Sequence, residues 1–358
     1  MDILMSYHKV GYEANGVDFT DYFPAYEIYT QTINVLYIDS NYTIPLSKNI
    51  KSTTNYVSFV QPYFVSGTGA TVYQLSSSIS TPSINDKTST SYKVWLNSSI
   101  SVASNINLVL WCITFYIQET PKTYIDQFSE ISNLNYKVNN VAYNPVLYFP
   151  QFMIHQNTLT ATGNQSLQNS LASKNTSSLL TSYLKFGSIT NNSVSTINSG
   201  DVQKIMYYEN PKVYNNYDIL FSISTRTLSI TLNTITLFLP PTNPVNNFIS
   251  NYNVGSDGLE KIFPVCERFI KAINGAAADR EFNHILNKNT RLTDNYIVLT
   301  SMTYTDSGSS GTFNPWEASS LTGIPIVANK TATSFDVFLK TPSGDNWSGG
   351  LVSLVIYI

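Results

Sequence analysis

Short runs in which bulky and polar residues alternate are the main pattern along this chain of 358 residues. Residues 92–96 (Tyr-Lys-Val-Trp-Leu) and residues 335–339 (Phe-Asp-Val-Phe-Leu) both alternate in this way, which is typical of a strand that buries one face. The runs at 108–117 and 351–358 are almost wholly apolar and predict strands covered on both faces. Clusters of Gly, Pro, Asn and Ser separate the runs. The pattern predicts an all-β fold of tandem antiparallel sandwiches of the jelly-roll kind.

Two segments of the chain match each other in order and spacing. Residues 46–57 share Leu, Lys, Asn, a basic residue, Thr, Asn and Tyr with residues 286–297, at a constant offset of 240. Residues 87–96 and 330–339 then share Lys-Thr-X-Thr-Ser followed by an alternating strand, at an offset of 243. Agreement of this extent indicates that one β-rich module occurs twice.

The duplication sets the domain organisation that we expect. We predict a first β-sandwich over residues 1–118, a linker over 119–145 and a second β-sandwich region over 146–358, with the repeated module at 45–118 and at 286–358. Residues 146–240 are either a degenerate third β module or an insertion in the second. Within them, the Asn-, Ser- and Thr-rich residues 156–200 predict a long polar excursion from the sheet.

One helix is expected, within residues 257–274. Asp257 and Glu260 have the spacing of a capping box, and Gly275 is suited to end a helix. Apolar residues between them recur at helical spacing: Ile262, Cys266, Phe269, Ile270 and Ile273.

The charged fraction of 12% is low, against about 25% in typical soluble proteins. Asn, Ser, Thr and 25 Tyr residues take the place of the missing charges. Such a surface is polar without being strongly charged, as in proteins that pack against copies of themselves or bind neutral partners. The net charge of −3 and the absence of a basic run predict no direct contact with nucleic acid.

The sequence carries no sign of secretion or membrane insertion. Residues 1–6 lack the basic region and apolar core of a signal peptide, and no apolar stretch is long enough for a membrane span. We therefore expect synthesis in a cytoplasm. Cys112 and Cys266 each lie in an apolar run, so we expect two buried free thiols, with a disulfide as the alternative.

Residue patterns of catalysis are missing. The three histidines, His8, His155 and His284, lie far apart, and no HExxH, CxxC, GxGxxG, Walker-type or GxSxG pattern occurs. Asp279 and Glu281 form one of several carboxylate pairs, which glycoside hydrolysis would need, but solvated surface charges explain them better. We predict no enzyme, no cofactor, no metal site and no catalytic residue.

Aromatic residues beside polar ones offer a different kind of site. Trp316 and the loop residues Asp345, Asn346 and Trp347 interleave aromatic and polar groups, and exposed aromatic rings stack on sugar faces. These four residues are the candidate glycan or receptor contacts. The alternative is that the aromatic rings pack at the ends of the sandwich.

Residues 325–337 (Pro-Ile-Val-Ala-Asn-Lys-Thr-Ala-Thr-Ser-Phe-Asp-Val), followed by Asp345-Asn346-Trp347 and a final apolar strand, resemble the C-terminal β-sandwich of phage fibre tips and of H-type-lectin-like modules. The tandem β modules and the charge-poor composition also resemble jelly-roll virion proteins. In double-jelly-roll capsid proteins, two similar sandwiches stand side by side.

This resemblance implies a non-enzymatic viral or phage structural protein, a jelly-roll capsid protein located in the virion. It would assemble with copies of itself and with other virion proteins into the shell. The alternative is a phage fibre, spike or lectin-like receptor-binding protein that recognises a host-surface glycan. A carbohydrate-active enzyme is the least favoured alternative.

Overall fold

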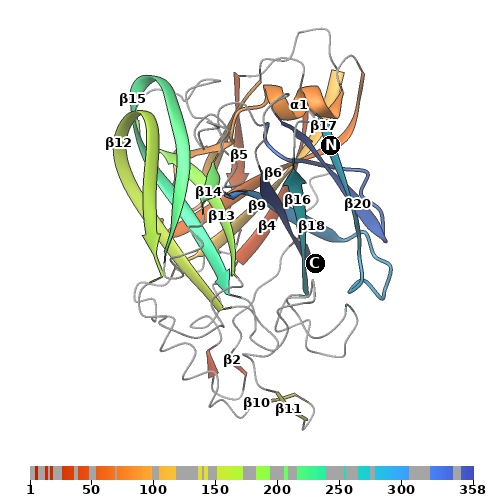
Figure 1. The fold of residues 1–358 in the computed structure, drawn as a ribbon. Helices are drawn as coiled ribbons and strands as arrows, with labels where there is room; N and C mark the ends of the chain where they lie inside the picture. The colour runs from red at the N-terminus through yellow and green to blue at the C-terminus, as the bar shows by residue number, and fades with distance from the viewer. Residues whose placement is uncertain are drawn as a thin grey trace.

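A computed structural model gives the fold of the chain (Figure 1). Among the residues that the structure describes, nearly all regular structure is strand, which confirms the all-β, sandwich-type prediction. The structure describes residues 5–6, 13–14, 17–18, 26–35, 39–47, 54–68, 71–98, 105–117, 136–138, 141–143, 151–171, 183–193, 205–208, 216–238, 254, 265–274, 279–305, 323–341 and 348–358.

A six-stranded arrangement, here called the first unit, occupies the N-terminal part of the chain. Its first strand pairs with its last (β4 with β9), and its second pairs with its next to last (β5 with β8). β6 pairs with β9, and β7 pairs with β8. The elements are β4 (Tyr26–Val35), β5 (Asp39–Pro45), β6 (Tyr56–Thr68), α1 (Val72–Ser78), β7 (Ser83–Asn85), β8 (Ser91–Asn97) and β9 (Asn105–Tyr116).

The C-terminal part, the second unit, has the same arrangement strand for strand. β16 pairs with β21, β17 with β20, β18 with β21 and β19 with β20, all antiparallel. The elements are β16 (Cys266–Asn274), β17 (Asp279–Ile285), β18 (Tyr296–Thr305), β19 (Ile326–Ala328), β20 (Ser334–Lys340) and β21 (Ser348–Tyr357). Each unit therefore begins before the segment in which the sequence repeat is plainest.

The predicted helix over residues 257–274 is wrong where the structure describes it, because Cys266–Asn274 is strand β16. All of its residues pair with β21, and this tertiary pairing overrides the local helical spacing. Phe269 and Ile273 are buried whereas Ile270 is 53% exposed, so the apolar residues do not form one helical face. Residues 257–264 lie outside the described part of the chain.

The repeat itself holds the signal that identifies β16 as a strand. At the offset of 240, Glu27, Ile33 and Asn34 of β4 recur as Glu267, Ile273 and Asn274 of β16.

The helix that does form, α1, begins after Thr71. The Thr71 side chain accepts a hydrogen bond from the backbone of Gln74, while the Gln74 side chain accepts one from the backbone of Thr71. This capping box, Thr-X-X-Gln, is readable in the sequence.

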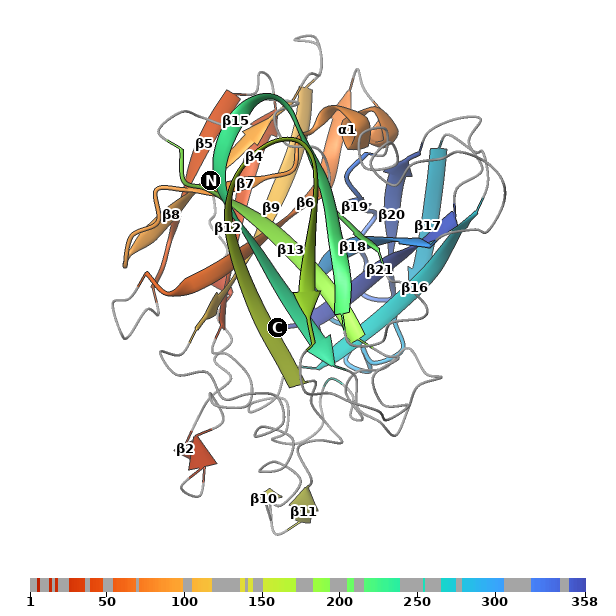
Figure 2. The ribbon, with the colours of Figure 1, turned by 60° about the vertical axis from the view of Figure 1, so that its left-hand side comes forward.

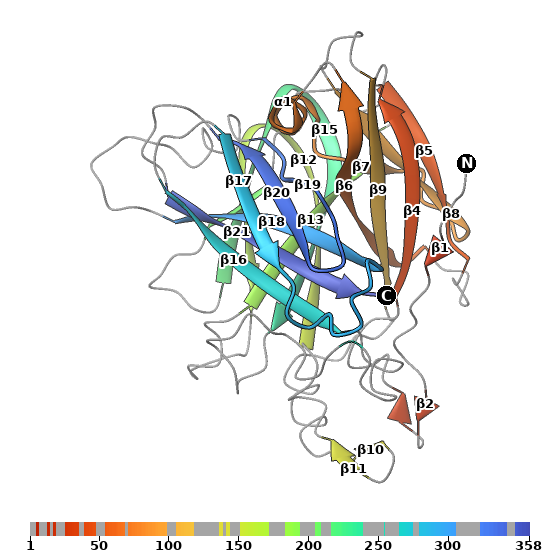
Figure 3. The ribbon, with the colours of Figure 1, turned by 90° about the vertical axis from the view of Figure 1, so that its right-hand side faces the viewer.

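Each of the two large sheets combines strands from both units. The seven-stranded sheet has the order β1-β4-β9-β6-β19-β20-β17, where β1 is Met5–Ser6. β6 of the first unit and β19 of the second are parallel neighbours in it, and Figure 3 shows these strands side by side. The ten-stranded sheet has the order β16-β21-β18-β14-β15-β13-β7-β8-β5, with β12 paired to β15.

β18 is the counterpart of β6 in the second unit, and β7 is the counterpart of β19 in the first. If the two units were related by exact symmetry, β18 and β7 would therefore pair as β6 and β19 do. Instead, strands from the middle of the chain lie between β18 and β7. Three strands occupy this place, and together with a fourth strand that pairs with one of them we call them the wing; the four form the left-hand part of Figure 1. They are β12 (Gln151–Ser170), β13 (Tyr183–Asn191), β14 (Met206–Tyr208) and β15 (Asn216–Phe238). Most of the predicted polar excursion, where described, is therefore strand.

β12 and β15 form one long antiparallel ribbon that folds back on itself. The register shifts between Ala161 and Gly163, and Gly163 has a φ of +70°, a conformation that favours glycine. Figure 2 shows the ribbon of β12 and β15 arching over. Across the fold, Asn157 Nδ2 donates to Asn169 Oδ1 at 2.8 Å. The two limbs of β12, residues 151–161 and 163–170, are thus held against each other.

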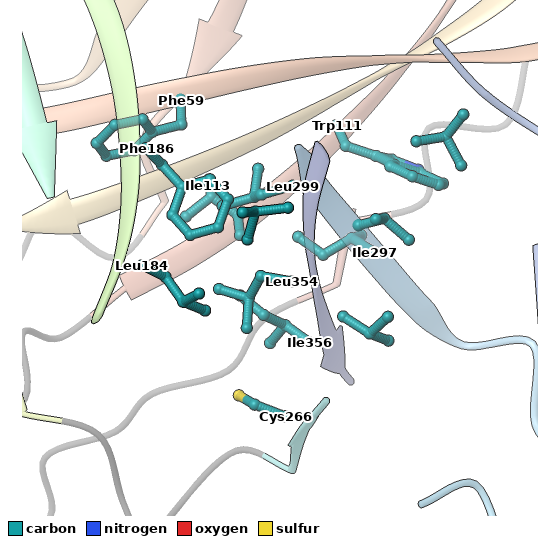
Figure 4. Packing of buried hydrophobic residues seen from close by; sticks show 14 of the residues in the cluster. Phe59, Trp111, Ile113, Leu184, Phe186, Cys266, Ile297, Leu299, Leu354 and Ile356 are labelled. Carbon is teal, nitrogen blue, oxygen red and sulfur yellow. The ribbon is translucent and has the colours of Figure 1, made fainter. Parts of the chain in front are cut away.

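The largest buried cluster contains residues from both units and from the wing. Ile113 of the first unit, Phe186 of the wing and Leu354 of the second all belong to it, and Figure 4 shows them packed together. Because apolar burial is the main stabilising term in folding, this cluster binds the three parts to one another. The boundaries predicted for separate regions, residues 1–118 and 146–358, stay a prediction.

A smaller buried cluster fills the wing. Phe221, Ile230 and Leu232 of β15 belong to it, together with Ile189 of β13 and Tyr207 of β14. The wing therefore has an apolar interior of its own, in addition to the residues that it contributes to the largest cluster.

Two small sheets lie apart from the large ones. β2 (Glu13–Ala14) pairs with β3 (Val17–Asp18), and β10 (Tyr136–Val138) pairs with β11 (Val141–Tyr143), the latter within the predicted linker. Cys112 and Cys266 are buried free thiols, as predicted. Among the described residues, no helix has the length and apolar character that crossing a membrane requires.

Candidate functional site

The predicted glycan contacts cannot be placed in the fold. Trp316, Asp345, Asn346 and Trp347 all lie outside the described residues. Trp316 falls between β18 and β19 in the sequence, and the other three fall between β20 and β21. Glycan or receptor contact at these residues therefore stays a prediction.

The repeated Lys-Thr-X-Thr-Ser segment forms a tight turn before β8. Thr88 Oγ1 accepts hydrogen bonds from the backbone nitrogens of Thr90 and Ser91, at 3.2 and 3.0 Å. The hydroxyl of Tyr56, on β6, donates to the carbonyls of Thr88 and Ser91 at 3.0 and 3.1 Å. The tyrosine thus closes the turn from the facing sheet.

The second unit builds the same turn before β20. Thr331 Oγ1 accepts from the backbone nitrogens of Thr333 and Ser334 at 3.2 and 3.0 Å. Tyr296 donates to the carbonyls of Thr331 and Ser334 at 2.9 and 3.0 Å. The most recognisable repeated motif is therefore explained by folding, since its first threonine and the tyrosine of the facing sheet hydrogen-bond the backbone of the turn.

The lysine of each motif lies over the tyrosine that closes the turn. Lys87 Nζ is 4.4 Å from the centre of the Tyr56 ring, and Lys330 Nζ is 4.6 Å from that of Tyr296. Lys330 also lies 5.4 Å from the ring of Trp111 in the first unit. These are cation–π distances. Burial lowers the pKa of both amines to about 8, although the Asp294 carboxylate opposes this at Lys330.

Two buried carboxylates at equivalent positions hold loops in place. Glu267 accepts hydrogen bonds from the backbone nitrogens of Asn287 and Lys288 and, at 2.6 Å, from the Tyr357 hydroxyl. Glu27 accepts from the Ser47 hydroxyl at 3.1 Å and from that of Tyr116 at 2.7 Å. Their acceptor capacity is taken up by neighbours in the same unit, which is the arrangement of a structural carboxylate.

Two of the remaining candidates for chemistry, His284 and Asp279, make contacts within the fold. The His284 ring stacks on Phe335 at 4.6 Å, and burial, assisted by Lys271, lowers its pKa to about 4, so it is neutral near pH 7. Asp279 forms an exposed ion pair with Lys340 at 2.6 Å. Within the described ranges, no group of His, Cys, Asp and Glu side chains is suited to hold a metal ion.

A buried polar cluster lies inside the wing. Lys185, only 2% exposed, places Nζ 5.1 Å from the centre of the Tyr217 ring and 5.7 Å from that of Tyr207. Tyr217 shares a hydrogen bond of 2.7 Å with Thr236 and accepts one of 3.2 Å from Asn169. Burial lowers the pKa of Lys185 well below its usual value.

This cluster connects the two limbs of the folded ribbon. Asn169 and Tyr217 come from one limb, whereas Thr236 comes from the other, next to Lys185 on β13. Polar groups buried in this way are expensive unless they are satisfied, so they favour one way of folding the ribbon over others. The sequence did not predict this cluster, because its residues are scattered between positions 169 and 236 of a chain rich in Asn, Thr and Tyr.

Comparison with known proteins adds no assignment. No family model matches the chain, and neither a curated protein nor a solved structure matches it significantly.

Proposed function

We propose that this chain is a non-enzymatic structural protein that assembles with copies of itself, as a jelly-roll-type component of a virion. One observation carries the proposal. The same six-stranded unit occurs twice within the chain, and both large sheets contain strands of both units. Two fused units with the same strand arrangement present related strands twice in one building block. Such a block is suited to making several contacts of one kind in a symmetric assembly.

The nested pairing within each unit supports the jelly-roll part of the proposal. In the sequence, the paired strands β4 and β9 enclose the paired strands β5 and β8. In the same way, β16 and β21 enclose β17 and β20. This nesting arises when a long hairpin is rolled into two facing sheets, which is how jelly rolls are built.

The chemistry of the described residues is consistent with a structural role. The buried carboxylates, the lysines of the repeated turns and His284 have packing or backbone-fixing roles. The charged fraction of 12% also leaves much of the polar surface uncharged, and uncharged surfaces of identical copies do not repel one another.

Electron microscopy of the purified full-length chain tests this proposal. Negatively stained samples at micromolar concentration are expected to show closed particles of uniform size and symmetry, such as rings or shells. A field of single chains only, under several salt and pH conditions, would contradict the proposal.

A further inference from the structure

The outer edge of β12 differs from every other described sheet edge in length. β12 has 20 residues and, within the described part of the chain, pairs only with β15. The other terminal strands of the large sheets are shorter: β1 has 2 residues, β5 and β17 have 7 each, and β16 has 9. Even with the bend at Gly163, each limb of β12 is longer than β5.

The β12 edge also lacks the residues that protect open strands. From Gln151 to Ser170 there is no Asp, Glu, Lys, Arg or Pro. By contrast, β5 begins at Asp39 and ends at Pro45. The two other long terminal strands carry charges, which are Asp279, Arg280 and Glu281 on β17 and Glu267, Arg268 and Lys271 on β16. Charges and proline are the usual means by which proteins keep exposed strand edges from pairing with other chains.

We propose that the edge of β12 is where two copies of this chain associate, with β12 of one copy antiparallel to β12 of the other. The inference rests on the proposed function, since it names the surface through which copies assemble. Antiparallel strand addition across a twofold axis would extend the sheet from one copy into the next through hydrogen bonds between the two backbones.

The side chains along β12 favour a second copy as the partner. Thr158, Thr160, Asn164, Ser166 and Gln168 are exposed and uncharged, and each carries an oxygen or amide group. Like charges directly opposite each other destabilise paired strands, whereas Thr, Ser, Asn and Gln are able to donate to and accept from identical residues. An uncharged strand has no group that would select a charged peptide, whereas a second copy of the same strand can pair with it without charge repulsion.

Two lysine substitutions, one on each limb, test the inference. Thr160→Lys and Ser166→Lys place a charge on the exposed edge, and Asn41→Lys on the exposed edge strand β5 is the matched control. Sedimentation equilibrium of the full chain gives the dissociation constant of the first association step. We expect at least one β12 variant to raise it about tenfold or more, with the control unchanged and all variants retaining the wild-type circular dichroism spectrum.

The outcomes separate this inference from the proposed function. If the wild-type chain assembles and neither β12 variant weakens assembly, the β12 surface is wrong and the assembly proposal stands. If the wild-type chain stays monomeric at all concentrations, both fail.

Cross-linking identifies the occupant of the edge. Thr160→Cys and Ser166→Cys variants are joined with a short bis-maleimide, and peptides are identified by mass spectrometry; the native thiols of Cys112 and Cys266 are buried. Links between two β12 peptides support the inference. Links from β12 only to another segment of the second copy would overturn it.

Discussion

Gln61 of the first unit accepts two hydrogen bonds from Thr300 of the second, at 3.1 Å from the backbone nitrogen and 2.6 Å from the hydroxyl. Its amide donates in turn to the carbonyl of Pro325 at 2.8 Å. Gln61 lies on β6 in the seven-stranded sheet, and Thr300 lies on β18 in the ten-stranded sheet. One buried side chain thus connects the two units and the two sheets.

We expect Gln61→Ala to lower the free energy of unfolding by about 2 kcal/mol, because it leaves the Thr300 nitrogen and the Pro325 carbonyl without this partner. Urea denaturation measures the change. Gln31→Ala is the control, since the described hydrogen bonds of the Gln31 side chain, with Tyr29 and Thr32, stay within β4. An unchanged stability of the Gln61 variant would show that the contact between the units does not depend on it.

Because the Lys-Thr-X-Thr-Ser turns of the two units have the same hydrogen bonds, we expect removal of the tyrosine hydroxyl to cost the same stability in each unit. Tyr56→Phe and Tyr296→Phe each remove a hydroxyl that donates to two turn carbonyls, so each is expected to destabilise the fold by about 1–2 kcal/mol. Thermal and urea unfolding measure both. A large effect at one tyrosine and none at the other would refute an equivalent role for the two turns.

Because His284 is buried in its neutral form, we expect the folded protein to lose stability in mild acid. Its pKa in the folded protein is about 4, below the unfolded value of about 6.5. The unfolded chain therefore binds more protons between these values, and stability falls as the pH drops from about 6.5 to 4, with a slope of up to about 1.4 kcal/mol per pH unit from this group. Above about pH 6.5 both states are neutral at this residue, and the contribution is constant.

The variant His284→Phe, which keeps an aromatic ring against Phe335, is expected to lack this part of the acid dependence. Urea unfolding at a series of pH values compares it with the wild type. Parallel stability curves for the two proteins over this acid range would show that His284 is not responsible.

In the wing, Gly187 lies so close to Tyr207 that any larger residue at position 187 would collide with the tyrosine. A Cβ added at Gly187 would overlap the Tyr207 hydroxyl oxygen, so Gly187→Ala is expected to destabilise the protein by about 1–3 kcal/mol. In a Tyr207→Phe background the oxygen is gone, and most of the loss should disappear. A double-mutant cycle measured by urea unfolding tests this, and an equal loss in both backgrounds would place the conflict elsewhere.

The alternation of Tyr92–Leu96 and Phe335–Leu339 predicted strands correctly, but the expectation of a single buried face was wrong, since all residues of Phe335–Leu339 and of Val94–Leu96 are buried. The spacing of Phe269, Ile270 and Ile273 misled, because pairing with β21 decides the conformation of that segment and is invisible in a local pattern. The matching glutamates at positions 27 and 267 would have corrected it. The repeat therefore carries more information about this fold than local periodicity does.

The wing was the least predictable part of the fold. Its strands β12 and β15 depend on a bend at Gly163 and on contacts such as Asn157–Asn169, neither of which leaves a periodic signature in a polar sequence. The uncharged stretch 151–170 was visible, but its meaning depends on its position at a sheet edge. Trp316 and Trp347, which the sequence pattern favoured, lie outside the described residues.

The mass of the purified full-length chain in solution decides whether the chain associates with copies of itself. Sedimentation velocity from nanomolar to tens of micromolar concentration is expected to show the monomer giving way to a species whose mass is an integral multiple of the chain mass. A single monomeric species over that whole range would contradict a protein built to assemble with copies of itself.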